Sequence, residues 1–165
     1  MSTTQLMDVM PAVTSLAYTE DEAFLIQQAL DILERHVFQP SSPIECPDEV
    51  RHFLRLKMGR EDHEVFAVLF LDTHHRLLAF EVLFHGTINA LHVHPRRILQ
   101  RALEHNCAAI ILVHNHPSGV TTPSWEDQQL TTNMKRLLAE LDIQLLDQFI
   151  VGQRDIYSFA EHGLL

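Results

Sequence analysis

The stretch from residue 108 to residue 119 reads Ala-Ala-Ile-Ile-Leu-Val-His-Asn-His-Pro-Ser-Gly. Its first six residues form a short apolar run of the kind found in buried strands. Pro117 disfavours helical geometry at the preceding residue, so the chain is expected to stay extended through His116. Because side chains alternate along a strand, His114 and His116 would point to the same side. The stretch therefore predicts a buried strand that ends in two convergent imidazoles.

A serine and an aspartate follow the two histidines at a fixed distance. Ser124 has the position of a helix N-cap, and Asp127 lies three residues on, as in a capping box. Residues at this spacing share one helical face and could look back at His114 and His116. A catalytic zinc takes three nitrogen or oxygen ligands from protein and leaves a fourth position to water. The two histidines and Asp127 supply that number, so the combination favours a metal site over separate polar residues.

Two glutamates are candidates for the proton acceptor that hydrolysis requires. Glu81 interrupts the apolar segment 77–84, where an unpaired charge is costly to bury. Partial burial would raise the pKa of this carboxyl toward the range of a general base. Glu64 enters the apolar segment 64–72 and qualifies by the same reasoning. The residues alone leave both open, beside the alternative that either carboxylate faces water at a strand edge.

Other histidine pairs lack these companions. His92 and His94 repeat the spacing of two, but no serine and aspartate follow them at a comparable distance. An arginine pair comes next instead, and its charge opposes the binding of a cation. His74 and His75 are expected in the turn of a hairpin. None of these four histidines is predicted to bind a metal.

Composition limits the classes of protein to which the chain can belong. Its 165 residues, 46% hydrophobic and 21% charged, are typical of a globular protein with a substantial core. The formal net charge of −10 argues against direct binding of nucleic acid, which usually requires a basic surface. No apolar run approaches the roughly 18 residues of a membrane span, and no basic residue precedes Arg35 to mark a signal peptide. Cys46 and Cys107 are too few for a disulfide scaffold, and the protein is expected to be cytoplasmic.

Hydrophobic periodicity predicts the order of secondary structure. Residues 1–60 are expected to form an N-terminal leader, loose over 1–18, followed by helices, and residues 61–165 a single catalytic domain. The order of elements predicts an α/β or α+β sheet flanked by helices. Helices are expected over about 20–36, 48–58, 95–106 and 124–141, and strands over about 64–72, 77–84, 108–113, 143–151 and 155–159.

The pattern His-x-His, seven residues, Ser-x-x-Asp, with an upstream glutamate, resembles that of the JAMM (MPN+/JAB) zinc metallopeptidases. Within that superfamily the chain is most similar to the RadC-like branch. The resemblance covers residues 63–160, and the HNHPSG stretch is its most specific part. The matching segments are Glu81 to Phe84, Gly86 to Asn89, His94 to Arg96, His114 to Gly119, Pro123-Ser124, Leu146-Asp147 and Ile150 to Gly152.

The resemblance implies a role for each motif residue and a cytidine-deaminase-like JAB/MPN fold. His114, His116 and Asp127 would bind Zn²⁺, with water as the fourth ligand. Glu81 would serve as general base, so it is the resemblance that favours Glu81 over Glu64. Ser124 would hydrogen-bond the developing oxyanion. The sequence departs from the family in two places, because Arg97 stands where the family commonly has Glu and Gln148 where it commonly has His.

The expected function is that of a zinc-dependent amide hydrolase of the peptidase or isopeptidase type. Its expected partners are a protein tail or peptide conjugate as substrate and, as one oligomeric arrangement, a second copy in a homodimer; a membrane partner is not expected. The alternative is a non-catalytic zinc-binding accessory module in DNA maintenance or repair. A nucleobase deaminase is excluded because His-x-Glu and Pro-Cys-x-x-Cys are missing. A nuclease is disfavoured by the acidic net charge.

Overall fold

The strand that leads to the two histidines is β3, Ala109–Asn115, and it lies at the centre of a five-stranded sheet. The computed structural model describes residues 19–37, 47–59, 61–86 and 92–165. The strand order is β2-β1-β3-β4-β5, with β3 and β4 parallel and the other neighbours antiparallel. The remaining strands are β1 Val65–Leu71, β2 Leu77–His85, β4 Gln144–Val151 and β5 Ile156–Ser158, and the helices are α1 Glu20–Val37, α2 Pro47–Met58, α3 Pro95–Glu104 and α4 Trp125–Ala139.

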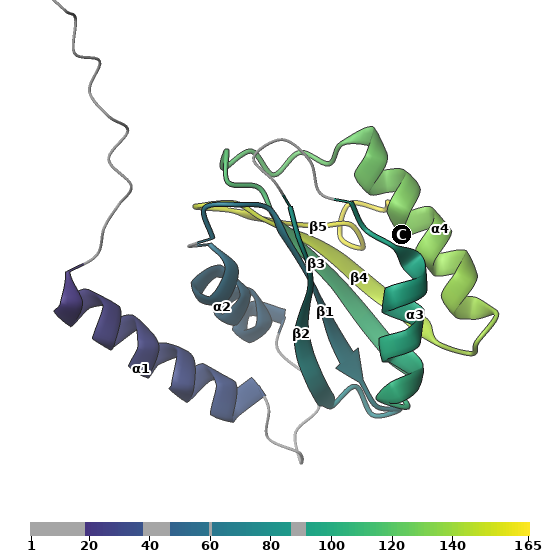
Figure 1. Cartoon of the computed structure of the whole chain (residues 1–165), viewed down its shortest axis with the longest axis horizontal. Coiled ribbons are helices and arrows are strands. Elements are labelled where there is room, and N and C mark those ends of the chain that lie inside the picture. Colours follow the sequence, from purple (N-terminus) through teal and green to yellow (C-terminus); the bar gives the residue numbers. More distant parts are fainter. Residues whose placement is uncertain (1–18, 38–46, 60, 87–91) are drawn as a thin grey trace, which may run out of the picture.

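Helices cover both faces of this sheet, as Figure 1 shows. On one face α2 packs through Phe53 and Leu54, which have no exposed surface. On the other face α3 and α4 pack through Ile98 and Met134, which are also fully buried. The mixed α/β architecture with a helix-flanked sheet confirms the fold class predicted from the sequence. Residues of α2 therefore belong to the hydrophobic cluster on that face of the sheet.

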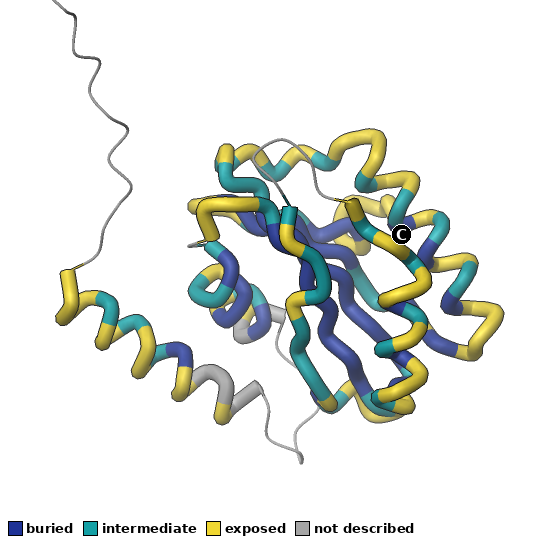
Figure 2. Tube along the Cα trace, viewed as in Figure 1, coloured by how far each residue is buried: buried dark blue, intermediate teal, exposed yellow. Residues whose placement is uncertain are grey.

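The two central strands owe their position to their composition. Every residue of β1 and of β3 is buried, and these strands form the dark centre of the molecule in Figure 2. Strands that are covered on both faces read as continuous apolar runs, because every side chain needs an apolar environment. Burying one Val, Leu, Ile or Phe side chain contributes about 1.5–3 kcal/mol. The run of apolar residues ahead of His114 therefore anchors the imidazoles in the most constrained part of the fold.

Each predicted helix and strand is present, with ends that differ from the prediction by a few residues at most. α1 begins with a capping box, in which the backbone N–H of Thr19 donates to Glu22 Oε2 over 2.8 Å. The predicted hairpin turn is also present, and His75 adopts a positive φ of 58° in it. Cys107 is a buried free cysteine. The predicted leader over 1–18 lies outside the described residues.

None of the described helices, in the ranges given above, is long and apolar enough to cross a bilayer.

Candidate metal centre

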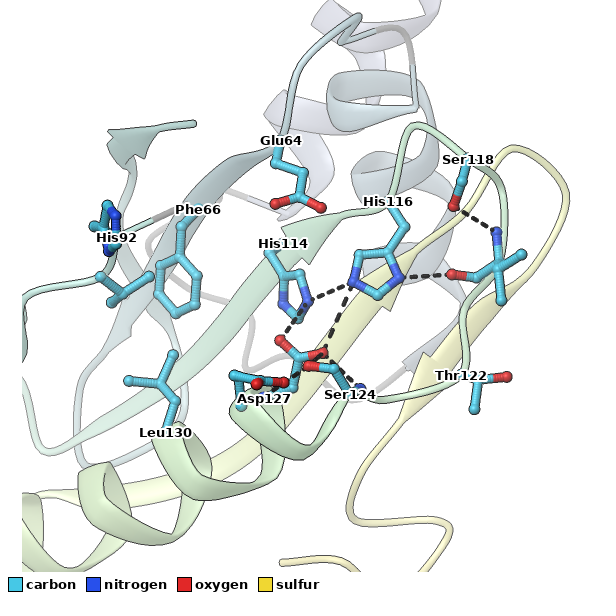
Figure 3. Close-up of a pocket in the computed structure, with 13 residues that line it drawn as sticks. Glu64, Phe66, His92, His114, His116, Ser118, Thr122, Ser124, Asp127 and Leu130 are labelled. Carbon is cyan, nitrogen blue, oxygen red and sulfur yellow. Dashed lines mark hydrogen bonds and ion pairs between the residues drawn. The ribbon is translucent and has the colours of Figure 1, made fainter. Parts of the chain in front are cut away.

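The chain crosses from the carboxyl end of β3 to the start of α4, and this crossing brings the predicted ligands together. His114 is the penultimate residue of β3, and His116 follows the strand directly. Asp127 lies in the first turn of α4. The nitrogen and oxygen atoms that these three residues offer all lie within 4.8 Å of one another. Figure 3 shows the two imidazoles and the carboxylate pointing at a common centre.

The distances between these atoms suit one small cation. His114 Nε2 lies 3.1 Å from His116 Nε2 and 3.1 Å from Asp127 Oδ1. Asp127 Oδ2 lies 3.8 Å from His116 Nε2. Ligands held at about 2.0–2.1 Å from a tetrahedral zinc lie about 3.3 Å from one another. Two imidazoles and one carboxylate also leave a fourth position open, so the donor set fits a catalytic zinc.

A hydrogen bond orients the second imidazole. His116 Nδ1 lies 2.6 Å from the carbonyl oxygen of Val120, to which it donates. A proton on Nδ1 leaves Nε2 with a free lone pair directed at Asp127 and His114. Metal-binding histidines commonly donate their second ring nitrogen to a carbonyl in this way. Val120 thus has a role, through its backbone, that no side-chain pattern in the sequence could reveal.

Burial orients the first imidazole. The side chain of His114 is 4% exposed, and its ring stacks on Phe66 with 6.0 Å between the centroids. Its Nδ1 atom is buried without a hydrogen-bond partner among the described residues. Apolar contacts therefore fix the plane of this ring and direct Nε2 toward the common centre.

Asp127 both closes the capping box and faces the histidines. Its Oδ2 accepts from the backbone N–H of Ser124 over 2.8 Å and from the Ser124 hydroxyl over 2.7 Å. The Asp127 N–H donates back to Ser124 Oγ over 3.1 Å. Burial raises the pKa of the Asp127 carboxyl, but hydrogen bonding and charge at His114 and hydrogen bonds from Ser124 outweigh it. The net effect lowers the pKa below its usual range, which favours the anion.

Replacing Ser124 with alanine is expected to destabilise the protein by about 1 kcal/mol, the usual cost of removing a serine N-cap. The change removes the hydroxyl that accepts from Asp127 N–H and donates to its carboxylate. Urea denaturation of the metal-free protein measures the effect. Ser118→Ala is the matched control, because the Ser118 hydroxyl only accepts a 3.4 Å contact from Val120 N–H. Equal stability of both variants would contradict the capping role.

The loop after His116 packs closely against the end of β4. The N–H of His116 donates to the carbonyl of Val151 over 2.9 Å. Gly119 turns the loop with a φ of 80°, a conformation that favours glycine. A Cβ on Gly152 would lie 2.6 Å from Thr121 Cγ2, so only glycine fits there without displacement of the loop. Both glycines therefore allow the loop to bring Val120 against His116.

The three converging side chains open into a pocket of about 740 Å³. Phe66 and Leu130 line one part of it, whereas Ser118 and Thr122 line another (Figure 3). His92 also lines the pocket but is not part of the convergent group. A pocket of this size, partly apolar and with few convergent polar groups, is typical of a ligand-binding site.

Glu64 is the glutamate that lines this pocket together with the two histidines. It is half-buried and lies two residues before Phe66, whose partner across the β1–β3 ladder is His114. Because side chains alternate along an extended chain, Glu64 shares the side of Phe66 and His114. Figure 3 shows its carboxylate directed toward the space beside His114 and His116.

Glu81 lies elsewhere, on β2, and is not among the described residues that line the pocket. Strand β1 separates β2 from β3, so Glu81 lies about 10 Å or more from the histidines at a strand spacing of about 4.8 Å. Its carboxylate accepts from Arg101 Nε over 2.7 Å and contacts His105 Nε2 over 2.7 Å. The hydrogen bonds from Arg101, assisted by His105 and opposed by burial, lower the pKa of Glu81 to about 2. An ion-paired carboxylate of this pKa is a poor general base at neutral pH.

Glu81→Gln is expected to lower the free energy of unfolding by about 1–2 kcal/mol at pH 7, because Arg101 loses one of its two charged partners and keeps only Glu104. The pKa of about 2 in the folded protein is below the ordinary glutamate value of 4.5. The ion pair therefore stabilises the protein fully above pH 4.5, and its contribution falls as the pH decreases toward 2. Denaturation of both proteins between pH 7 and pH 3 tests this dependence. An unchanged difference at low pH would show that the effect does not arise from the ionised carboxylate.

The chain is similar to known proteins over most of its length. The family model described as the RadC-like JAB domain matches residues 44–164. The UPF0758 protein YkfG of Escherichia coli (strain K12) is 50% identical over 147 residues, which are 89% of this chain and 93% of the relative.

Longer relatives share the same region. The UPF0758 protein of Leptothrix cholodnii is 50% identical over 143 residues, which are 85% of this chain but 64% of the relative. A further relative, Mpe_A2695 of Methylibium petroleiphilum, is 54% identical over 121 residues, which are 73% of this chain and 54% of the relative. The chain thus spans somewhat more than half of the length of these two proteins. From the matched region and the identities, the chain belongs to the family of RadC-like JAB-domain proteins.

Proposed function

We propose that this protein is a zinc-dependent hydrolase of amide bonds, of the peptidase or isopeptidase type. The observation that carries the proposal is the convergence of His114, His116 and Asp127 at a pocket that a further carboxylate, Glu64, also lines. The three donors suit zinc in number and chemistry, and the pocket leaves room for a substrate. When bound there, zinc would act as a Lewis acid and lower the pKa of a water molecule.

Glu64 is the general base in this proposal. Its carboxylate would accept a proton from the attacking water and then deliver it to the leaving nitrogen of the amide. Ser124, at the rim, would donate its hydroxyl to the oxygen of the attacked carbonyl after release from Asp127 Oδ2. The assignment of Glu81 as base remains a prediction from the resemblance, and the ion pair with Arg101 counts against it.

The charges around the pocket favour an amide over a phosphodiester as substrate. Among the described lining residues, the charged side chains other than histidine are Glu64, Glu126 and Asp127, all acidic. Such a wall repels a phosphate backbone, whose binding depends on lysine and arginine. The apolar part at Phe66 and Leu130 offers contact to a neutral or apolar side chain of a peptide. A protein tail or peptide conjugate is therefore the proposed substrate class.

The test combines metal content with a substrate screen. Protein purified without added zinc should contain about one zinc per chain, as expected for one three-ligand site. The zinc-loaded protein is then incubated with a library of linear and isopeptide-linked peptides, and cleavage is followed by mass spectrometry. Cleavage that stops on chelation and returns with zinc supports the proposal.

Two other outcomes have distinct meanings. Zinc at full occupancy without cleavage would favour the accessory-module alternative. Absence of zinc even after reconstitution would contradict the metal centre itself.

A further inference from the structure

Asn115 lies between the two imidazoles in the sequence but serves a different part of the molecule. It is the last residue of β3 and is 2% exposed. Because side chains alternate along a strand, its amide points away from the face that carries His114 and His116. Among the described residues, no contact within the metal centre involves this side chain.

The Asn115 amide instead makes three hydrogen bonds to the backbone that leads into β1. Its Oδ1 accepts from the N–H of Val65 over 2.7 Å. Its Nδ2 donates to the carbonyl of His63 over 3.0 Å and to that of Glu61 over 3.4 Å. A reversed amide would place its NH₂ group against the Val65 N–H and its oxygen against two carbonyls, so only one orientation satisfies all three partners. The bonds reach the residues on both sides of Glu64.

These bonds lie beyond the end of the hydrogen-bond ladder between β1 and β3. The β1–β3 pairing runs from Leu71 to Phe66, and the described ladder has no pair before Phe66. On the other side of the segment, the carbonyl of Glu64 accepts from Gly86 N–H over 2.7 Å. Glu64 is therefore held from one side by Gly86 and from the other by Asn115. A buried polar side chain with all of its bonding groups satisfied rigidifies the backbone that it contacts.

We propose that Asn115 is a positioning residue that aligns Glu64 with His114, His116 and Asp127. The inference rests on the proposed function, in which Glu64 is the base. Asn115 lies between His114, which is in β3, and His116, which follows the strand directly. The same short segment therefore places both histidines and, through the Asn115 amide, the backbone beside Glu64. Catalytic groups tolerate little displacement, since a shift of about 1 Å can cost about 100-fold in rate.

Two substitutions separate the parts of this contact. Asn115→Ala removes all three bonds. Asn115→Asp has nearly the same shape and keeps the acceptor for Val65 N–H, but it sets a carboxylate oxygen against the carbonyls of His63 and Glu61. Asn115→Asp can therefore test the positioning role even if Asn115→Ala does not fold. Asn133→Ala is the matched control, because Asn133 only accepts from Arg136 on α4.

The experiment measures zinc content, amide hydrogen exchange and the kinetics of cleavage of one library peptide that the wild type cleaves. Zinc should stay at about one per chain, since no ligand changes. Exchange at residues 61–65 should become faster in both Asn115 variants. The kcat should fall about 10–100-fold with KM within about twofold, because the base is misplaced while the pocket remains.

A double-mutant cycle separates positioning from a general structural effect. In a Glu64→Gln background, Asn115→Ala should cause no further loss of kcat, because the group that Asn115 aligns is already missing. Equal losses of kcat in both backgrounds, or an unchanged kcat in the single variant, would overturn the inference. Loss of zinc from the Asn115 variants would also overturn it, since the amide would then support the ligands.

Failure of the proposed hydrolase function can be distinguished from failure of the inference about Asn115. If the zinc-loaded wild type cleaves no peptide, the hydrolase proposal fails and exchange alone decides the role of Asn115. Unchanged protection of the Val65 amide in Asn115→Ala would then overturn the inference. Faster exchange confined to residues 61–65 would support the inference that Asn115 positions Glu64.

Discussion

Glu64→Gln is expected to lower kcat by about 10²–10⁴-fold, the usual contribution of a general base. Glutamine keeps the size of the side chain and its hydrogen-bonding oxygen but cannot accept a proton at neutral pH. Zinc should remain bound, because Glu64 lines the pocket without belonging to the convergent group. Cleavage of a library peptide under single-turnover conditions, with the metal content measured on the same sample, gives both quantities.

Glu81→Gln is the matched control for this experiment. The substitution is chemically the same, but it lies on β2 in contact with Arg101. We expect it to affect stability far more than kcat. If Glu81→Gln removed activity with zinc bound and Glu64→Gln did not, the base would be Glu81, as the resemblance alone implies. The pocket geometry would then have to change when substrate binds.

His116→Ala is expected to reduce zinc to well below one per chain and to remove the stabilisation that zinc provides. A ligand that binds only the folded state at about 1,000 times its Kd contributes about 4 kcal/mol. For a protein of this size that corresponds to a decrease in Tm of roughly 8–16 °C. The decrease should match the effect of chelation on the wild type. Calorimetry with and without chelator, together with elemental analysis, measures both.

His116→Ala is a better test than His114→Ala, because it destabilises the protein in fewer ways besides the loss of zinc. His116 is partly exposed, whereas His114 is buried against Phe66, so His114→Ala would add the cost of a cavity. Asp127→Asn is a second variant, because an amide oxygen can still accept from Ser124 while the charge is lost.

His92→Ala is the control for this set. His92 lines the same pocket but lies outside the convergent group. Equal zinc loss in His92→Ala would contradict the three-residue site.

Some features could be predicted because their cause is local. The apolar run before His114 is typical of a strand that is covered on both faces, as a central strand of a helix-flanked sheet is. Helical periodicity likewise predicted α4, and its end at Ala139 is two residues from the expected one. The positions of the proposed metal ligands also have local causes. The side-by-side position of His114 and His116 follows from the period of a strand, and the orientation of Asp127 follows from its capping box with Ser124.

Other features depend on which strands become neighbours. Glu64 and Glu81 have similar local surroundings in the sequence, since each carries a charge into an apolar strand. Their difference arises from the strand order, which sets β1 beside β3 and β2 one strand farther away. It also depends on α3, whose Arg101 pairs with Glu81. The hydrophobic periodicity of either segment does not indicate which of the two strands lies beside β3.

From the amino-acid sequence one can infer the order of helices and strands, the family, and the three side chains that converge at the end of β3. Periodicity, turn chemistry and a short motif suffice for these, because they involve residues close together in the chain. The packing of the strands was needed to show which glutamate lines the pocket and that Asn115 holds the backbone beside it. Those contacts join residues about fifty positions apart, as the Asn115–Val65 bond does with a separation of 50. Long-range contacts of this kind follow from the register of packed strands, which no local pattern specifies.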